Sequence, residues 1–243
     1  MTGKKRSVSL VLRGLLWALL LAPPLGCTVA TTQVAPRTAP APSPAPSPPD
    51  DIDRKASEPY QGDLSIFEDP RRDQNLQIER VMDILGIRDG SDVADIGAGS
   101  GWFTVRAARR VREAGLVYAV EINRDYLKYI EDRAAREKLA NVRTVLGKED
   151  DPQLPEGSVD AVLLLKTYHE VAQPVRLLKR VRQAMRAGAR LGIIDRNGKG
   201  DDHGLDADAV VKEAGRAGFT LVEQHDFVKP DGMDYFLVFR ASS

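Results

Sequence analysis

The chain has 243 residues, a length that allows one large domain or two small ones. Its 35 basic and 35 acidic residues give a formal net charge of zero, so no overall electrostatic field favours nucleic acid or an anionic membrane surface. The single cysteine excludes an internal disulfide, and the three histidines are scattered without a partner at metal-ligand spacing. Composition therefore disfavours a nucleic-acid-binding protein, a disulfide-stabilised fold and a metal centre.

Residues 1–27 have the pattern of a bacterial export signal. Basic residues at 4–6 precede an apolar run whose longest uninterrupted part, 14–22, is too short to cross a hydrocarbon layer of ~30 Å. Cys27 follows Gly26, four residues beyond this run, and resembles the lipidated cysteine of a lipoprotein signal. Pro24 stands where such signals usually carry an aliphatic residue, so simple cleavage, for instance after Ala30, is the alternative. We expect export to the cell envelope, with a lipid anchor in the membrane if Cys27 is modified, or a cytoplasmic location if the signal is not used.

Residues 28–59 are expected to form a linker. Eight of the fifteen prolines of the chain lie there, alternating with alanine, serine and threonine. The segment has no apolar periodicity to bury, and its prolines favour an extended chain of about 3.1 Å per residue. It suits a disordered spacer between a membrane anchor and a folded domain, which we expect at residues 60–243.

Helical and strand patterns alternate through residues 60–243. Helices are predicted at 76–85 and around Val105, Ile130, Leu178 and Val210, and strands at 92–96, 117–121, 142–146, 159–165 and 190–195, the last after a structural turn at 187–189. Two further strand patterns, 220–228 and 234–240, flank a Lys-Pro-Asp-Gly turn and predict a hairpin. The alternation predicts an α/β fold: a doubly wound, mostly parallel seven-stranded sheet with helices on both faces and a C-terminal antiparallel hairpin.

The stretch 93–104 is the most informative motif. A short apolar run containing Asp95 leads into a helical pattern that begins near Trp102. Three glycines lie between them at alternate positions: Gly97, Gly99 and Gly101. A strand, a glycine turn and a helix in this order build a nucleotide site, because the bare backbone can approach the ligand closely. Trp102 stands where dinucleotide binders require a further glycine, which disfavours a nicotinamide oxidoreductase.

An acid stands at the end of the next predicted strand. Glu121 lies twenty residues after Gly101, and a carboxylate there can accept hydrogen bonds from both hydroxyls of a ribose. The motif Asp-Ile-Gly-Ala-Gly-Ser-Gly at 95–101, followed by this acid, resembles the class I S-adenosylmethionine-dependent methyltransferases. The resemblance extends over 60–243, since these enzymes share the Rossmann-like sheet with a terminal hairpin, and it implies S-adenosylmethionine as the cofactor.

The resemblance also implies roles for individual residues. The backbone of the three glycines would pack against the methionine part of the cofactor, Asp95 would hold its amino end, and Glu121 would take the ribose. Glu149 or Asp150 would lie near the adenine amino group, although Lys148 stands where the family most often has its aspartate. A solvated acidic turn is the alternative for these two acids.

Tyr168 and His169 follow the fourth predicted strand. Ligands of such sheets bind beyond the carboxyl ends of the strands, so either side chain could orient a methyl acceptor or take its proton. A structural hydrogen bond at a helix start is the alternative for His169. His203, in a glycine- and aspartate-rich loop that could form a lid, and His225, inside a strand pattern, are expected to have no catalytic role.

We expect methyl transfer from S-adenosylmethionine to an unidentified acceptor. A small molecule is favoured over nucleic acid, because the chain lacks the Asn-Pro-Pro-Tyr and catalytic-cysteine signatures of nucleic-acid methyltransferases. The export signal conflicts with a cofactor made in the cytoplasm. The alternative is therefore a non-catalytic, envelope-associated binding protein on the same scaffold.

Overall fold

The computed structural model describes residues 50, 52, 55–199 and 202–242. The predicted export signal, with Cys27, and most of the predicted linker lie outside these residues. Within the described part of the chain, every helix is too short or too polar to cross a bilayer.

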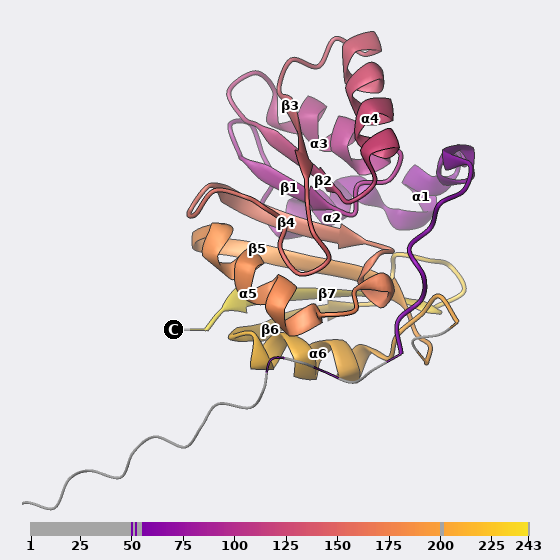
Figure 1. Ribbon diagram of the computed structural model, residues 1–243, viewed down its shortest axis with the longest axis vertical. Helices are drawn as coiled ribbons and strands as arrows, with labels where there is room; N and C mark the ends of the chain where they lie inside the picture. The colour runs from indigo at the N-terminus through magenta and orange to yellow at the C-terminus, as the bar shows by residue number, and fades with distance from the viewer. Residues whose placement is uncertain (1–49, 51, 53–54, 200–201, 243) are drawn as a thin grey trace, which may run out of the picture. The chain divides into compact units, whose positions relative to one another are not determined.

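Seven strands of the described residues form one sheet in the order β3-β2-β1-β4-β5-β7-β6 (Figure 1). They are β1 (Val93–Ile96), β2 (Val117–Glu121), β3 (Val142–Leu146), β4 (Val159–Leu165), β5 (Met185–Arg196), β6 (Phe219–His225) and β7 (Asp234–Ala241). The first five strands pair in parallel, whereas β7 is antiparallel to both β5 and β6. The predicted sheet and its terminal hairpin are confirmed.

Helices cover both faces of this sheet. They are α1 (Arg72–Leu76), α2 (Ile78–Leu85), α3 (Trp102–Val111), α4 (Arg124–Arg136), α5 (Pro174–Ala184) and α6 (Ala207–Arg216), with 3₁₀ turns η1 (Leu64–Phe67) and η2 (Tyr168–Glu170). Side chains alternate along β1: Val93 packs with α2 and α3, whereas Ala94 and Ile96 pack with α5 and α6. This period of two places an apolar core on each face, as a doubly wound sheet requires.

The start of β5 differs from the sequence prediction. The sequence predicts a turn at 187–189 before a strand that begins at Arg190, but β5 begins at Met185, directly after α5. Met185 pairs with Val159, and the regular register with β4 resumes only at Arg190. Gly188 has a φ of 83°. The predicted turn is therefore an irregularity inside the strand, since extra residues are accommodated as a bulge.

The strand order reverses between β1 and β4, which lie side by side at the centre of the sheet. The crossover connections from these two strands leave in opposite directions, and their carboxyl ends meet at one edge. Open α/β sheets bind their ligands in the crevice at such a point.

Candidate functional site

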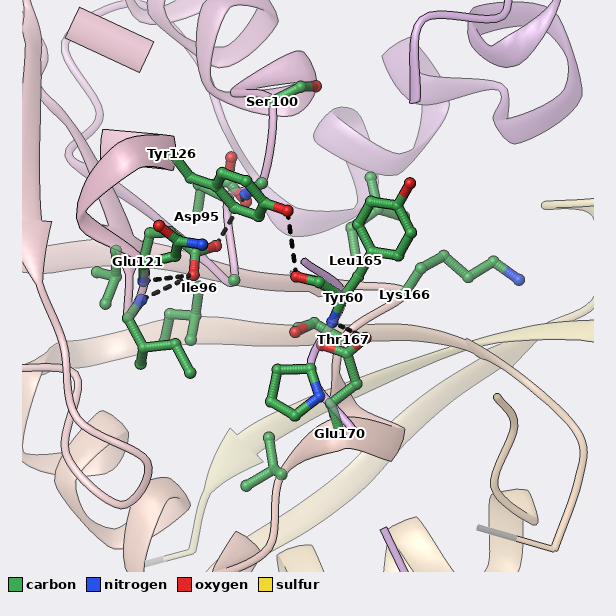
Figure 2. A pocket seen from close by; sticks show the side chains of 18 of the residues that line it. Tyr60, Asp95, Ile96, Ser100, Glu121, Tyr126, Leu165, Lys166, Thr167 and Glu170 are labelled. Carbon is green, nitrogen blue, oxygen red and sulfur yellow. Dashed lines mark hydrogen bonds between the residues drawn. The ribbon is translucent and has the colours of Figure 1, made fainter. Parts of the chain in front are cut away.

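A cavity of about 890 Å³ lies at the carboxyl ends of β1, β2 and β4. Asp95 lines it from β1, Glu121 from the end of β2, and Thr167 and Glu170 from the segment after β4 (Figure 2). A volume of this size suits a small organic ligand or cofactor. The cavity therefore coincides with the switch point of the sheet.

The glycine turn supplies the floor of the cavity where a side chain would not fit. Gly97 has a φ of 71°, and a Cβ there would lie 2.3 Å from Oγ1 of Thr167. Gly99, with a φ of 54°, also lines the cavity. Gly101 is not among the lining residues, and a Cβ on it would lie 3.1 Å from Ile130 of α4. The first two glycines thus expose backbone to a ligand, whereas the third permits close packing of the turn on α4.

Glu121 ties the end of β2 to the glycine turn. Its Oε2 accepts a hydrogen bond from the Gly99 amide at 3.0 Å, and its Oε1 accepts from the amides of Ile122 at 2.8 Å and Asn123 at 3.2 Å. The side chain is buried but lines the cavity (Figure 2). Three amides thereby fix the carboxylate, and a carboxylate retains acceptor capacity for hydroxyl donors of a ligand.

Asp95 is the other predicted acid at the centre of the cavity. It is 2% exposed, and its Oδ2 accepts a hydrogen bond from Oγ1 of Thr104 at 2.6 Å. Burial raises the pKa of Asp95 to about 7, against the opposing effects of the Thr104 hydrogen bond and the positive charge of Arg72. A cationic ligand group would favour the ionised form of this carboxyl.

Glu149 and Asp150, the two acids predicted to lie near the adenine, line different hollows of the structure. Glu149 lines the cavity together with Lys148. Asp150 instead lines a second hollow, where its carboxylate lies 4.0 Å from Nη1 of Arg176. Of the two alternatives, the structure brings only Glu149 to the site.

Tyr168 and His169 are both turned into the protein. Tyr168 is fully buried, and its hydroxyl donates to Oε2 of Glu213 at 2.8 Å. Nδ1 of His169 lies 2.9 Å from Oδ1 of Asp195, whose Oδ2 accepts from the His169 amide at 3.0 Å. Neither residue lines the cavity. The sequence predicts that one of them faces the ligand, but the tight η2 turn directs both side chains to buried acids instead.

Glu170 is the next residue, and the sequence predicts no catalytic role for it. It lines the cavity, and burial raises its pKa to about 7. Its Oε1 accepts a hydrogen bond from the Tyr60 amide at 3.3 Å (Figure 2). The same oxygen lies 3.9 Å from Nε2 of His169. The only signal in the sequence was its place beside a histidine after β4.

Residues 56–61 form another wall of the cavity, although the sequence places 28–59 in the linker. The Ser57 amide donates to the carbonyl of His169 at 3.1 Å. The Tyr126 hydroxyl donates to the carbonyls of Tyr60 at 3.3 Å and Gly62 at 3.0 Å. These contacts hold the segment against the ends of β2 and β4, so it belongs to the site.

Comparisons with known proteins agree with this geometry. The protein-family model described as "Methyltransferase domain" matches residues 93–188, from β1 to the start of β5. These residues are thus similar to a methyltransferase domain. S-adenosylmethionine is the cofactor that these comparisons indicate for this chain.

The relatives and solved structures that are similar to this chain cover different parts of it. Nocamycin O-methyltransferase of Saccharothrix syringae is 29% identical over 114 residues, which are 47% of this chain and 41% of that protein. The ubiquinone/menaquinone biosynthesis C-methyltransferase UbiE of Azotobacter vinelandii is 28% identical over 115 residues, 47% of this chain and 46% of that protein. The chain thus spans less than half the length of these relatives. A SAM-dependent methyltransferase from Aquifex aeolicus, 23% identical with a TM-score of 0.66 over 74% of this chain and 98% of that one, shares the fold.

The residues of the cavity fit S-adenosylmethionine. Gly97 leaves its backbone open to a ligand, because the residue has no Cβ, and a Cβ built there would collide with Thr167. Glu121 offers a fixed carboxylate to ribose hydroxyls, and Asp95 offers a carboxyl to an ammonium group. These donors and acceptors match the sugar and the amino-acid end of the cofactor. The individual cofactor contacts stay predictions.

Proposed function

We propose that the protein transfers a methyl group from S-adenosylmethionine to a small-molecule acceptor. One observation carries the proposal. Glu121, at the end of β2, accepts a hydrogen bond from the Gly99 amide of the glycine turn, and both residues line the same cavity. A small acceptor is supported by the names of two relatives, which describe methyltransferases of nocamycin and of ubiquinone and menaquinone biosynthesis. The cavity volume of about 890 Å³ leaves room for a second small ligand.

The work of the chain is to align the reactants and exclude water. When bound, S-adenosylmethionine supplies an electrophilic methyl carbon, whose bond to sulfur breaks with the electron pair left on sulfur. Glu121 and Asp95 would fix the two ends of the cofactor, so that the transfer geometry is set before the acceptor arrives. The wall formed by residues 56–61 would cover the bound pair from solvent.

We place the proton acceptor at Glu170. The bond from the acceptor atom to the methyl carbon forms as the acceptor loses a proton, and a carboxylate in the cavity can take that proton. Glu170 lines the cavity, whereas the predicted candidates Tyr168 and His169 do not. A pKa of about 7, caused by burial, suits proton transfer near neutral pH. His169 does not line the cavity, but its Nδ1 contacts Asp195 and its Nε2 faces Glu170, so it would position the Glu170 carboxylate.

Label transfer tests the proposed function. The full-length protein is incubated with S-adenosylmethionine carrying a labelled methyl group and with separated small-molecule, protein and nucleic-acid fractions of a bacterial extract. We expect label in the small-molecule fraction, formation of S-adenosylhomocysteine, and neither with the Glu121→Ala variant. Label in protein or nucleic acid would contradict the acceptor class. Binding of S-adenosylhomocysteine without label in any fraction would point to a non-catalytic binding protein.

We further propose that the protein is exported and anchored to the membrane through Cys27. The proposal rests on the basic start, the short apolar run and the position of this cysteine before the proline-rich segment. The Cys27→Ser variant is expected to move from the membrane fraction to the soluble fraction when the two are separated by centrifugation. A wild-type chain that is already soluble and unmodified would contradict the anchor.

A further inference from the structure

Arg72 is a cation of the cavity that no motif identifies. It begins α1, outside the residues matched by the methyltransferase model, and its side chain lines the cavity beside the glycine turn. Its guanidinium lies over the Trp102 ring, 4.4 Å from the ring centroid, and 5.6 Å from that of Phe67. Nη1 donates to the Phe67 carbonyl at 2.8 Å. Two aromatic rings and one carbonyl therefore hold the group in a fixed position.

No carboxylate of the described residues forms an ion pair with Arg72. Burial lowers the pKa of Arg72 to about 10, which reflects the cost of keeping this charge away from water. Arg106 lies over the same Trp102 ring, at 3.8 Å, but it pairs with both carboxylate oxygens of Asp73. Buried charges in proteins are normally paired. A largely buried arginine that faces a cavity without an ion pair is a site for an anion.

We propose that Arg72 binds the carboxylate of the methionine part of the cofactor. The inference rests on the proposed cofactor binding, and S-adenosylmethionine contains one anionic group, this carboxylate. Asp95 lines the same cavity, close enough for the positive charge of Arg72 to act on it. The two side chains together would recognise the ammonium and carboxylate of an amino acid. The amino-acid end of the cofactor then lies toward α1 and α3, and its ribose lies toward Glu121.

Two ligands that differ in the amino-acid end test the assignment. S-adenosylhomocysteine carries the carboxylate, and 5′-methylthioadenosine has the same adenosine and thioether without it. In calorimetric titrations of the full-length protein, Arg72→Met is expected to weaken S-adenosylhomocysteine binding by about 10- to 150-fold, the effect of losing a charge-assisted pair. The affinity for 5′-methylthioadenosine is expected to change by less than about 3-fold. Arg72→Lys should recover part of the loss, since it keeps the charge without the planar donors.

Arg106→Met is the matched control, because Arg106 contacts the same ring but pairs with Asp73. It is expected to change neither affinity. If Arg72→Met weakens the affinity for both ligands equally, Arg72 only shapes the cavity and the inference is overturned. An unchanged affinity for S-adenosylhomocysteine would also overturn it. If the wild type binds neither ligand, the proposed function fails as well. Arg72→Gln replaces Arg72→Met if thermal unfolding shows that the methionine variant does not fold.

Discussion

Replacement of Glu121 by alanine is expected to weaken S-adenosylhomocysteine binding by at least about 100-fold, measured by titration calorimetry on the full-length protein. The loss has two sources. The carboxylate can no longer accept ribose hydroxyls, and each hydrogen bond to a charged group contributes about 1.5–3 kcal/mol. The amides of Gly99, Ile122 and Asn123 also lose their acceptor, so the end of the glycine turn loses one of its hydrogen bonds to β2.

Two further variants separate these sources. Glu121→Gln keeps the volume and one acceptor oxygen, and it is expected to lose about 10-fold in affinity. Glu131→Ala removes an exposed acid of α4 that contacts Thr144, and it is expected to leave the affinity unchanged. A folded Glu121→Ala variant that binds S-adenosylhomocysteine like the wild type would remove this acid from the site.

Substitution of Asp95 by asparagine is expected to change how the free energy of unfolding depends on pH. Burial raises the pKa of Asp95 from its ordinary value near 3.8 to about 7 in the folded protein. The folded state therefore holds a proton that the unfolded chain releases. The resulting stabilisation is complete below the unfolded pKa and is lost as the pH rises through about 7. Asparagine cannot titrate, so the unfolding free energy of the variant should rise relative to the wild type by about 2–3 kcal/mol between about pH 5 and about pH 8.

Urea denaturation of both proteins across this pH range measures the difference. Only the change with pH is informative, since asparagine alters the hydrogen bond with Thr104 by an amount that does not depend on pH. Asp132→Asn, at an exposed residue of α4 that pairs with Lys128, is expected to give a difference that is constant with pH. A constant difference for Asp95→Asn would show that this carboxyl is ionised in the folded state throughout the range.

The sequence predicted the parts of the fold that follow from periodic patterns of apolar residues, and the turn whose backbone conformation requires glycine. The alternation of helices and strands gave the sheet and its hairpin, and two of the three glycines of the turn lie on the cavity. Glu121 could be placed because it ends a strand, and the ends of parallel strands share one edge. The start of β5 was not predictable in the same way, since Gly188 reads as a turn but lies inside a bulged strand.

The residues on the irregular segments could not be predicted. Tyr168, His169 and Glu170 form a single 3₁₀ turn, in which three consecutive side chains point in different directions. Only Glu170 reaches the cavity, and no periodic pattern distinguishes it from its neighbours. Arg72 precedes the glycine motif by more than twenty residues, so its approach to the cavity depends on tertiary packing over Trp102.

The most direct test of the central claim is a crystal structure of the protein with S-adenosylhomocysteine. The claim predicts the ligand in the cavity at the ends of β1, β2 and β4, with both ribose hydroxyls within hydrogen-bond distance of Glu121. The homocysteine part should lie along Gly97 and Gly99, and the adenine on the side of Glu149. A ligand bound elsewhere, or with its ribose directed away from Glu121, would contradict the account.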